Sequence, residues 1–210
     1  MWGAGVTFQQ ETYSPFENRQ STIAVRIYLT GFMASGKSTA GPLVAKELDL
    51  HFIDLDDVIE AEAGQSIPSI FEAQGESAFR RLESEALRAT RDGAGVVALG
   101  GGALVDADNL AFAKSHGTVV YLRVPVDELV RRLRDTAGER PLLLDDTGTP
   151  LSDDDLRAKI DRMLTDRRPY YEQAHLTVNG AQPVRHVVAD IVESVGERSG
   201  GKEEWGKRGG

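Results

Sequence analysis

The sequence predicts an α/β fold in which a parallel sheet is covered by helices on both faces. Two observations support this prediction. Short apolar segments rich in β-branched residues alternate along the chain with longer segments of helical periodicity. Strands that alternate with helices pair in parallel, because each crossover helix packs on a face of the sheet. The length of 210 residues also suits one such domain with a sizeable core.

Five strands are expected from their apolar composition. The first, residues 23–29, reads Ile-Ala-Val-Arg-Ile-Tyr-Leu and runs into a glycine-rich loop. The third, residues 96–99, also runs into glycines, at residues 100–102. The other three strands are expected at residues 51–54, 118–122 and 176–178.

Helices are expected where apolar residues recur at helical spacing between the strands. Leu43, Val44 and Leu48 predict the first helix directly after the glycine-rich loop. Gly64 is expected to end the second helix, and Pro68 suits the first turn of the third. The predicted helices cover residues 39–48, 57–63, 67–74, 76–90, 106–115, 126–133, 156–171 and 183–195.

Three segments show neither helical nor strand periodicity in their apolar residues. Residues 138–155 contain Gly, Pro and Asp and are expected to form a mobile loop. Residues 1–21 are expected to be a flexible N-terminal extension, and residues 197–210, rich in Gly, Lys and Glu, a disordered tail. The folded domain is therefore expected at residues 22–196.

Composition excludes several classes of function. The net charge of −9 argues against nucleic acid or an anionic membrane as the main partner. The lack of cysteine excludes disulfides and thiolate metal sites, and the four scattered histidines suit surface or packing positions. We see no apolar run of membrane-spanning length and no secretory signal, so we expect a cytoplasmic protein.

Residues 31–38 form the most informative motif, Gly-Phe-Met-Ala-Ser-Gly-Lys-Ser. Glycines at its two ends let the backbone fold into a nest whose N–H groups point at phosphate oxygens. In this motif Lys37 is expected to reach the β- and γ-phosphates, and the Ser38 hydroxyl to ligate Mg²⁺. Because a predicted strand precedes the loop and a predicted helix follows it, we predict a nucleoside triphosphate site.

Two carboxylates follow the second predicted strand. Asp54 and Asp56 are two residues apart, and strand side chains at this spacing point to the same side. The carboxyl ends of parallel strands bind ligands, so the pair could hold Mg²⁺ through water and accept a proton from a hydroxyl. Equally, these residues suit the cap and first turn of a helix. The sequence leaves both interpretations open.

Glycines and arginines supply two weaker signals. Gly100, Gly101 and Gly102 would let a substrate approach the backbone after the third strand, although a plain turn is the alternative. Arginines cluster in this acidic chain, and most of them suit solvated helix faces. Arg140 lies in the predicted mobile loop, where an arginine can neutralise charge on a transferring phosphoryl group.

Taken together, these segments resemble the shikimate kinase family. The resemblance covers roughly residues 23–195 and rests on the order of its motifs. They are residues 31–39, 52–56, 59–60, 64–67, 70–71, 75–76, 79–83, 99–102, 119–122, 140–143 and 167–171. It implies a five-stranded parallel sheet of the P-loop, nucleoside monophosphate kinase type, with a lid at about residues 134–155.

The resemblance also implies the reaction and its partners. ATP would phosphorylate the 3-hydroxyl of shikimate, in the biosynthesis of chorismate and aromatic amino acids, with Mg²⁺ as cofactor. The enzyme is expected to act as a monomer without nucleic acid or membrane.

Site residues follow from the matching motifs. Asp56, Lys37 and Arg140 would be catalytic, and Asp54 would hold Mg²⁺ through water beside Ser38. The nucleotide would contact Gly31, Ala34, Ser35, Gly36, Lys37, Ser38, Thr39, Arg132, Arg140 and Pro183. Shikimate would contact Asp56, Arg80, Glu83, Gly100, Gly101, Gly102 and Arg167, with the two arginines clamping its carboxylate and Glu83 steadying Arg80.

Two other classes of function suit parts of the sequence. A related kinase, acting on gluconate or a nucleoside monophosphate, would lack a use for the paired arginines Arg80 and Arg167. A non-catalytic nucleotide-sensing module would not need the full set of Lys37, Ser38 and the two aspartates. The absence of an Asn-Lys-x-Asp guanine motif argues against a GTPase.

Overall fold

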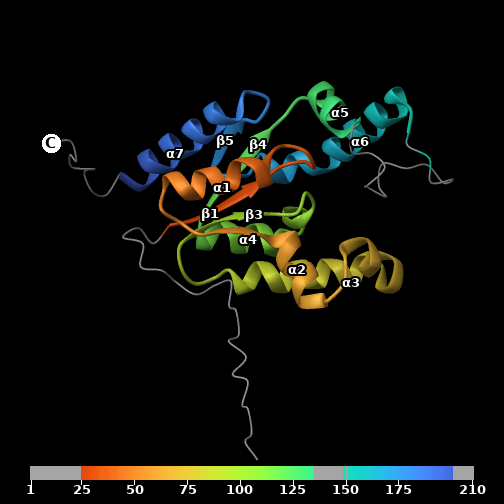
Figure 1. The fold of residues 1–210 in the computed structure, drawn as a ribbon, viewed down its shortest axis with the longest axis horizontal. Helices are drawn as coiled ribbons and strands as arrows, with labels where there is room; N and C mark the ends of the chain where they lie inside the picture. Colours follow the sequence, from red (N-terminus) through yellow and green to blue (C-terminus); the bar gives the residue numbers. More distant parts are fainter. Residues whose placement is uncertain (1–24, 135–148, 150, 201–210) are drawn as a thin grey trace, which may run out of the picture.

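The computed structural model describes residues 25–134, 149 and 151–200. These residues contain one five-stranded sheet whose order is β2-β3-β1-β4-β5, with every neighbouring pair parallel (Figure 1). The strands are β1 (Arg26–Thr30), β2 (Phe52–Asp54), β3 (Gly95–Ala98), β4 (Thr118–Arg123) and β5 (Leu176–Asn179). The predicted α/β class and the five parallel strands are confirmed.

Helices connect the strands as the alternating pattern predicted. They are α1 (Lys37–Glu47), α2 (Leu55–Ala63), α3 (Ile67–Ala89), the short 3₁₀ helix η1 (Ala103–Val105), α4 (Ala107–His116), α5 (Val126–Arg134), α6 (Asp153–Tyr171) and α7 (Val184–Gly200). Within the described residues, no helix combines the length and apolar character that crossing a membrane requires.

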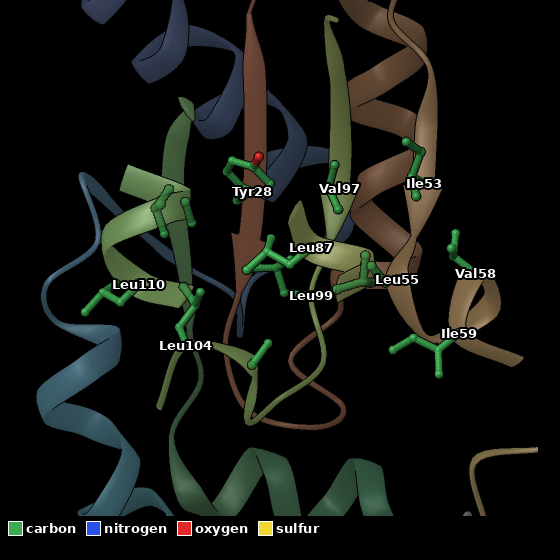
Figure 2. Packing of buried hydrophobic residues seen from close by; sticks show 14 of the residues in the cluster. Tyr28, Ile53, Leu55, Val58, Ile59, Leu87, Val97, Leu99, Leu104 and Leu110 are labelled. Carbon is green, nitrogen blue, oxygen red and sulfur yellow. The ribbon is translucent and has the colours of Figure 1, made fainter. Parts of the chain in front are cut away.

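The two faces of the sheet carry separate apolar cores, because successive strand residues point to opposite sides. Ile27 and Leu29 of β1 pack with α1 and α7 on one face. Tyr28, between them in sequence, packs with α3 and α4 on the other. Figure 2 shows Tyr28 beside Val97 of the neighbouring strand, with Leu87 of α3 in the same cluster. The fold is therefore three-layered, α/β/α, as predicted.

Several helices begin or end at other residues than the sequence predicts. The loop expected to reach residue 155 ends earlier, because Ser152 caps α6 through Asp155 N–H and the helix begins at Asp153. Helix α7 continues through Gly200, so the tail expected from residue 197 begins as helix. Most of the predicted lid, residues 135–148 and 150, lies outside the described residues, as do the termini at 1–24 and 201–210.

The break predicted between two helices near residue 75 is present as a kink. Gly75 has φ of +79° and ψ of 174° within α3, a conformation outside the helical region that glycine adopts readily. The second half of α3 therefore runs in its own direction.

The strand order decides where a ligand can bind. β1 and β3 are neighbours, but the chain after β1 forms α1 on one face of the sheet, whereas the chain after β3 forms α4 on the other. A crevice opens at the carboxyl ends of the strands at such a switch point. The phosphate-binding loop follows β1, Asp54 ends β2, and Gly100 follows β3, so all three segments reach this edge.

Gly117, between α4 and β4, offers a test of how this turn packs against β1. A methyl group there would lie 2.5 Å from the Arg26 carbonyl oxygen and 2.9 Å from the Tyr28 ring, so Gly117→Ala forces backbone to move. We expect a loss of about 1–3 kcal/mol in the free energy of unfolding, measured by urea denaturation. The matched control is Gly196→Ala in α7, where nothing lies within 4 Å and a gain of about 0.5–1 kcal/mol is expected. Equal effects of the two changes would contradict this account.

Candidate functional site

The phosphate-binding loop joins β1 to α1 and is already folded as a nest. Gly31 and Gly36 have φ of +142° and +100°, backbone conformations that favour glycine. Lys37 is buried, and its Nζ donates hydrogen bonds to the carbonyl oxygens of Gly31 at 3.0 Å and Phe32 at 3.1 Å. The loop therefore holds the lysine ammonium inside its own curve, next to where its backbone would receive phosphates.

Ser38 and Asp54 meet next to this loop. Ser38 Oγ donates a hydrogen bond of 2.6 Å to Asp54 Oδ2. The other carboxylate oxygen of Asp54 accepts from the backbone N–H of Asp56 at 3.2 Å and so caps α2. The cap interpretation of Asp54 is confirmed. Its other oxygen contacts the loop serine, and its role toward Mg²⁺ remains a prediction.

The Ser38 and Asp54 oxygens suit Mg²⁺. Hydroxyl and carboxylate oxygens are hard ligands of the kind this ion prefers. Across the described ranges, no group of three or more His, Cys, Asp or Glu side chains is placed to hold a metal ion alone. Mg²⁺ commonly binds through one or two protein oxygens together with substrate phosphates and water, so this pair fits a nucleotide-borne ion.

Asp56 reaches the site from a helix, which corrects the strand-based prediction. β2 ends at Asp54, and Asp56 lies in the first turn of α2. Burial raises the pKa of Asp56, and the neighbouring Asp54 carboxylate raises it further, while Lys37 acts in the opposite direction. The Asp56 carboxylate is thus more basic than an ordinary aspartate and lies within the field of the loop lysine.

Gly100 brings a second carboxylate close to Asp56. A methyl group at Gly100 would lie 2.4 Å from Glu83 Oε1 and 3.2 Å from Asp56 Oδ1. Residue 100 must therefore lack a side chain. Glu83 is 1% exposed, and its Oε1 has no hydrogen-bond partner among the described residues. Burial raises the pKa of Glu83, although the adjacent Arg80 opposes that shift.

Arg80 is held on α3 by two acidic residues. Its Nη1 donates to Glu83 Oε2 at 2.7 Å, and its Nη2 donates to Glu76 Oε1 at 3.1 Å. A methyl group at Gly102 would lie 2.7 Å from Arg80 Nη1. The guanidinium therefore lies flat against the glycine segment, with its orientation fixed by α3.

Arg167 approaches the same glycines from α6. Its Nη1 donates to the Gly101 carbonyl oxygen at 3.1 Å, and its guanidinium lies 5.6 Å from the centre of the Phe32 ring. The Tyr171 hydroxyl donates to the same carbonyl oxygen. Arg80 and Arg167, 87 positions apart in sequence, thus flank one turn of backbone.

Two cavities lie along this edge. The first, about 340 Å³, is lined by Glu76, Arg80, Glu83, Ser84, Gly102, Ala103, Val105, Asp106, Asn109 and Arg167. Both arginines line it, together with three carboxylates, of which Glu76 and Glu83 pair with Arg80. An acid of the size of a single ring fits such a space, and a bidentate guanidinium contact suits its carboxylate.

The second cavity, about 320 Å³, lies on the other side of the phosphate-binding loop. It is lined by Ala34, Ser35, Gly36, Thr39, Ala40, Arg132, Gly180, Gln182, Val184 and Val187. Arg132 Nη2 donates to the Gly180 carbonyl oxygen at 2.9 Å, which ties α5 to the segment before α7. Pro183 is exposed and lies between two lining residues.

The structure brings most predicted site residues together. The nucleotide group lines or adjoins the second cavity, and the two arginines, Glu83 and Gly102 line the first. Asp56, Gly100 and Gly101 adjoin that cavity without lining it. Arg140 lies outside the described residues, so its position remains a prediction.

Sequence reasoning missed three residues that support the arginines. Glu76 pairs with Arg80 at a spacing of four, a pattern that the sequence does display. The Phe32 ring contacts Arg167, and the Tyr171 hydroxyl bonds to Gly101. In both pairs the two residues are far apart in sequence. No local pattern points to those two contacts.

Comparisons with known proteins identify the family of this chain. The family model described as shikimate kinase matches residues 33–196. A shikimate kinase of Salinibacter ruber is 54% identical over 186 residues, which cover 87% of this chain and 91% of that protein.

Solved structures of shikimate kinases share the fold of this chain. Shikimate kinase from Bacteroides thetaiotaomicron superposes with a TM-score of 0.75 at 35% identity, covering 81% of this chain and 98% of that one. Shikimate kinase from Acinetobacter baumannii, solved in complex with shikimate, gives 0.73 at 35% identity, covering 86% and 96%. The chain belongs to the shikimate kinase family.

Proposed function

We propose that this chain transfers the γ-phosphoryl group of ATP to the 3-hydroxyl of shikimate by means of the residues described above. The observation that carries the proposal is the convergence, at one sheet edge, of a phosphate-binding loop, a basic carboxylate and two arginines on one glycine turn. Phosphoryl transfer needs mainly positioning and charge neutralisation, and these groups supply both.

On the nucleotide side, the loop binds the phosphates. Backbone N–H groups of residues 31–39 and the Lys37 ammonium face the β- and γ-phosphates, and Arg132 and Pro183 flank the adenine. Ser38 and Asp54, the latter through water, would hold Mg²⁺, which neutralises phosphate charge when bound. Arg140 would add a positive charge to the same phosphates.

On the acceptor side, the arginines fix the substrate. Arg80 and Arg167 bind the shikimate carboxylate from two directions, and Gly101 and Gly102 form the wall of the pocket. Glu83 holds Arg80 in place through the 2.7 Å ion pair. A ring clamped at its carboxylate turns its hydroxyls toward Asp56, which gives the orientation that transfer requires.

Asp56 orients and deprotonates the nucleophile. The 3-hydroxyl oxygen forms a bond to the γ-phosphorus while the bond from that phosphorus to the β–γ bridging oxygen breaks. ADP leaves, and the hydroxyl proton passes to the Asp56 carboxylate. The raised pKa of Asp56 favours this transfer, because a more basic carboxylate accepts the proton more readily.

The remaining assignments concern the chain as a whole. We propose one kinase domain at residues 22–196 with a closing lid at about residues 134–155. The phosphate-binding loop, Asp56 and both arginines come from the same chain, which suits a monomer. We further propose that it works in the cytoplasm, where ATP is supplied.

The function is tested by ADP release from MgATP with shikimate, with gluconate, and with a panel of nucleoside monophosphates. We expect turnover that depends on shikimate. It should fall about a hundredfold or more in Lys37→Ala, because the substitution removes the positive charge that faces the transferred phosphoryl group. The matched control is Lys46→Ala, an exposed lysine of the same helix, which should retain turnover. ADP release that depends on another acceptor would contradict the proposal.

The arginine clamp predicts a split between the two substrates. Arg80→Ala and Arg167→Ala should each raise KM for shikimate about 10- to 100-fold, because charge-assisted hydrogen bonds to the carboxylate are lost. KM for ATP should change by less than about threefold. Arg81→Ala and Arg168→Ala, exposed neighbours of the clamp, are the controls. Equal increases in both KM values would mean that the clamp is wrongly placed.

Asp56→Asn should separate activity from stability. We expect kcat to fall about 10²- to 10⁴-fold through loss of the base. The pKa of Asp56 is raised in the folded state, so its ionised form opposes folding near neutral pH and the variant should melt at a higher temperature. This advantage should shrink as pH falls through the raised pKa, because the carboxylate is then protonated.

Wild-type kcat/KM should fall over the same acid range. Glu62→Gln, an exposed change on α2, serves as the control for both readouts. A melting temperature of Asp56→Asn below that of the wild type at neutral pH would contradict the account of Asp56 burial.

A further inference from the structure

The Gly101 carbonyl oxygen receives two hydrogen bonds from a single helix. Arg167 Nη1 donates one at 3.1 Å and the Tyr171 hydroxyl donates the other. Both donors lie in the last part of α6, one helical turn apart, and therefore on the same helix face. One is charged and half-buried, whereas the other is neutral and buried.

The bond to Gly101 restrains the direction in which the Arg167 guanidinium can face a substrate. A guanidinium binds a carboxylate best through two parallel N–H groups in a planar fork. Here Nη1 is already directed at a backbone oxygen. Turning the fork toward a carboxylate weakens that bond, and a half-buried carbonyl left without a donor opposes the turn.

The surroundings of Tyr171 hold its hydroxyl in the bond to the Gly101 carbonyl oxygen. Its side chain is 1% exposed, and its ring stacks on Tyr121 of β4 at a centroid distance of 5.0 Å. Burial raises the pKa of Tyr171 to about 12 although the neighbouring Arg167 acts in the opposite direction, so the hydroxyl keeps its proton near neutral pH and can donate.

We propose that Tyr171 is a positioning residue for the substrate clamp: its hydroxyl holds the Gly101 carbonyl and thereby allows Arg167 to turn from that carbonyl to the substrate carboxylate. Gly101 then stays in place, whichever partner Arg167 has. This inference rests on the proposed function, since it assigns Arg167 to the carboxylate of shikimate.

Tyr171→Phe removes the hydroxyl and keeps the stacked ring. We expect KM for shikimate to rise about five- to tenfold, the equivalent of one lost hydrogen bond, with KM for ATP within about twofold of wild type. Tyr121→Phe is the matched control, because it removes a hydroxyl from the partner ring of the same stack. It should leave both KM values within about twofold.

A double-variant cycle tests the route through Arg167. In an Arg167→Ala background, Tyr171→Phe should add less than about twofold to KM for shikimate, because no guanidinium remains to be released. An equal rise in both backgrounds would overturn the proposal, since Tyr171 would then act on the glycine turn alone. A shikimate KM that does not respond to Tyr171→Phe in the native background would overturn it as well.

The readout separates this idea from simple destabilisation and from the function itself. Partial unfolding lowers the amount of active enzyme and hence kcat, but it leaves KM unchanged. Absence of shikimate turnover in the unaltered chain would overturn the proposed function and this inference together. Normal turnover with an unchanged KM in Tyr171→Phe would overturn only the inference.

Discussion

The parallel pairing of β1 with β3 on one side and β4 on the other is the constraint on which the site depends. Parallel strands need crossover helices, and these cover both faces and bury β1 completely. The same pairing brings the carboxyl ends of β1, β2 and β3 to one edge. A phosphate-binding loop, a capped helix and a glycine turn follow those ends. The strand order therefore decides which functional groups lie next to one another.

The edge concentrates charges that oppose folding. Burial raises the pKa of both Asp56 and Glu83, and the charge of Asp56 raises the pKa of Glu83 further. The nearby arginines offset only part of this cost. Replacing buried charged groups with well-packed apolar groups often leaves a protein equally stable or more stable. Their presence at this edge is in keeping with the roles proposed for Asp56 as the base and for Glu83 as the partner of Arg80.

Single residues in this site serve structure and chemistry together. Asp54 caps α2 with one oxygen and receives Ser38 with the other. Helix α6 packs against α5 in the core formed by Leu156, Ile160 and Leu164, and its last turn delivers both donors to Gly101. Because the same elements hold the core and the site, the functional groups lie on rigid supports, where small errors in position are suppressed.

Local patterns in the sequence were sufficient for the strands, the helices, the phosphate-binding loop and the family. β-branched runs, helix caps and the Gly-rich motif act within a few residues, and they keep their meaning in the folded chain. The helical position of Asp56, the contact of Gly102 with Arg80 and the Tyr171–Gly101 bond were decided only by the tertiary structure. They depend on where β2 ends and on how α3 and α6 pack beside η1, distances set between segments 20 to 70 residues apart. Burial of Glu83 belongs to the same class, because only the packed layers remove water from a side chain that the sequence shows as an ordinary helical glutamate.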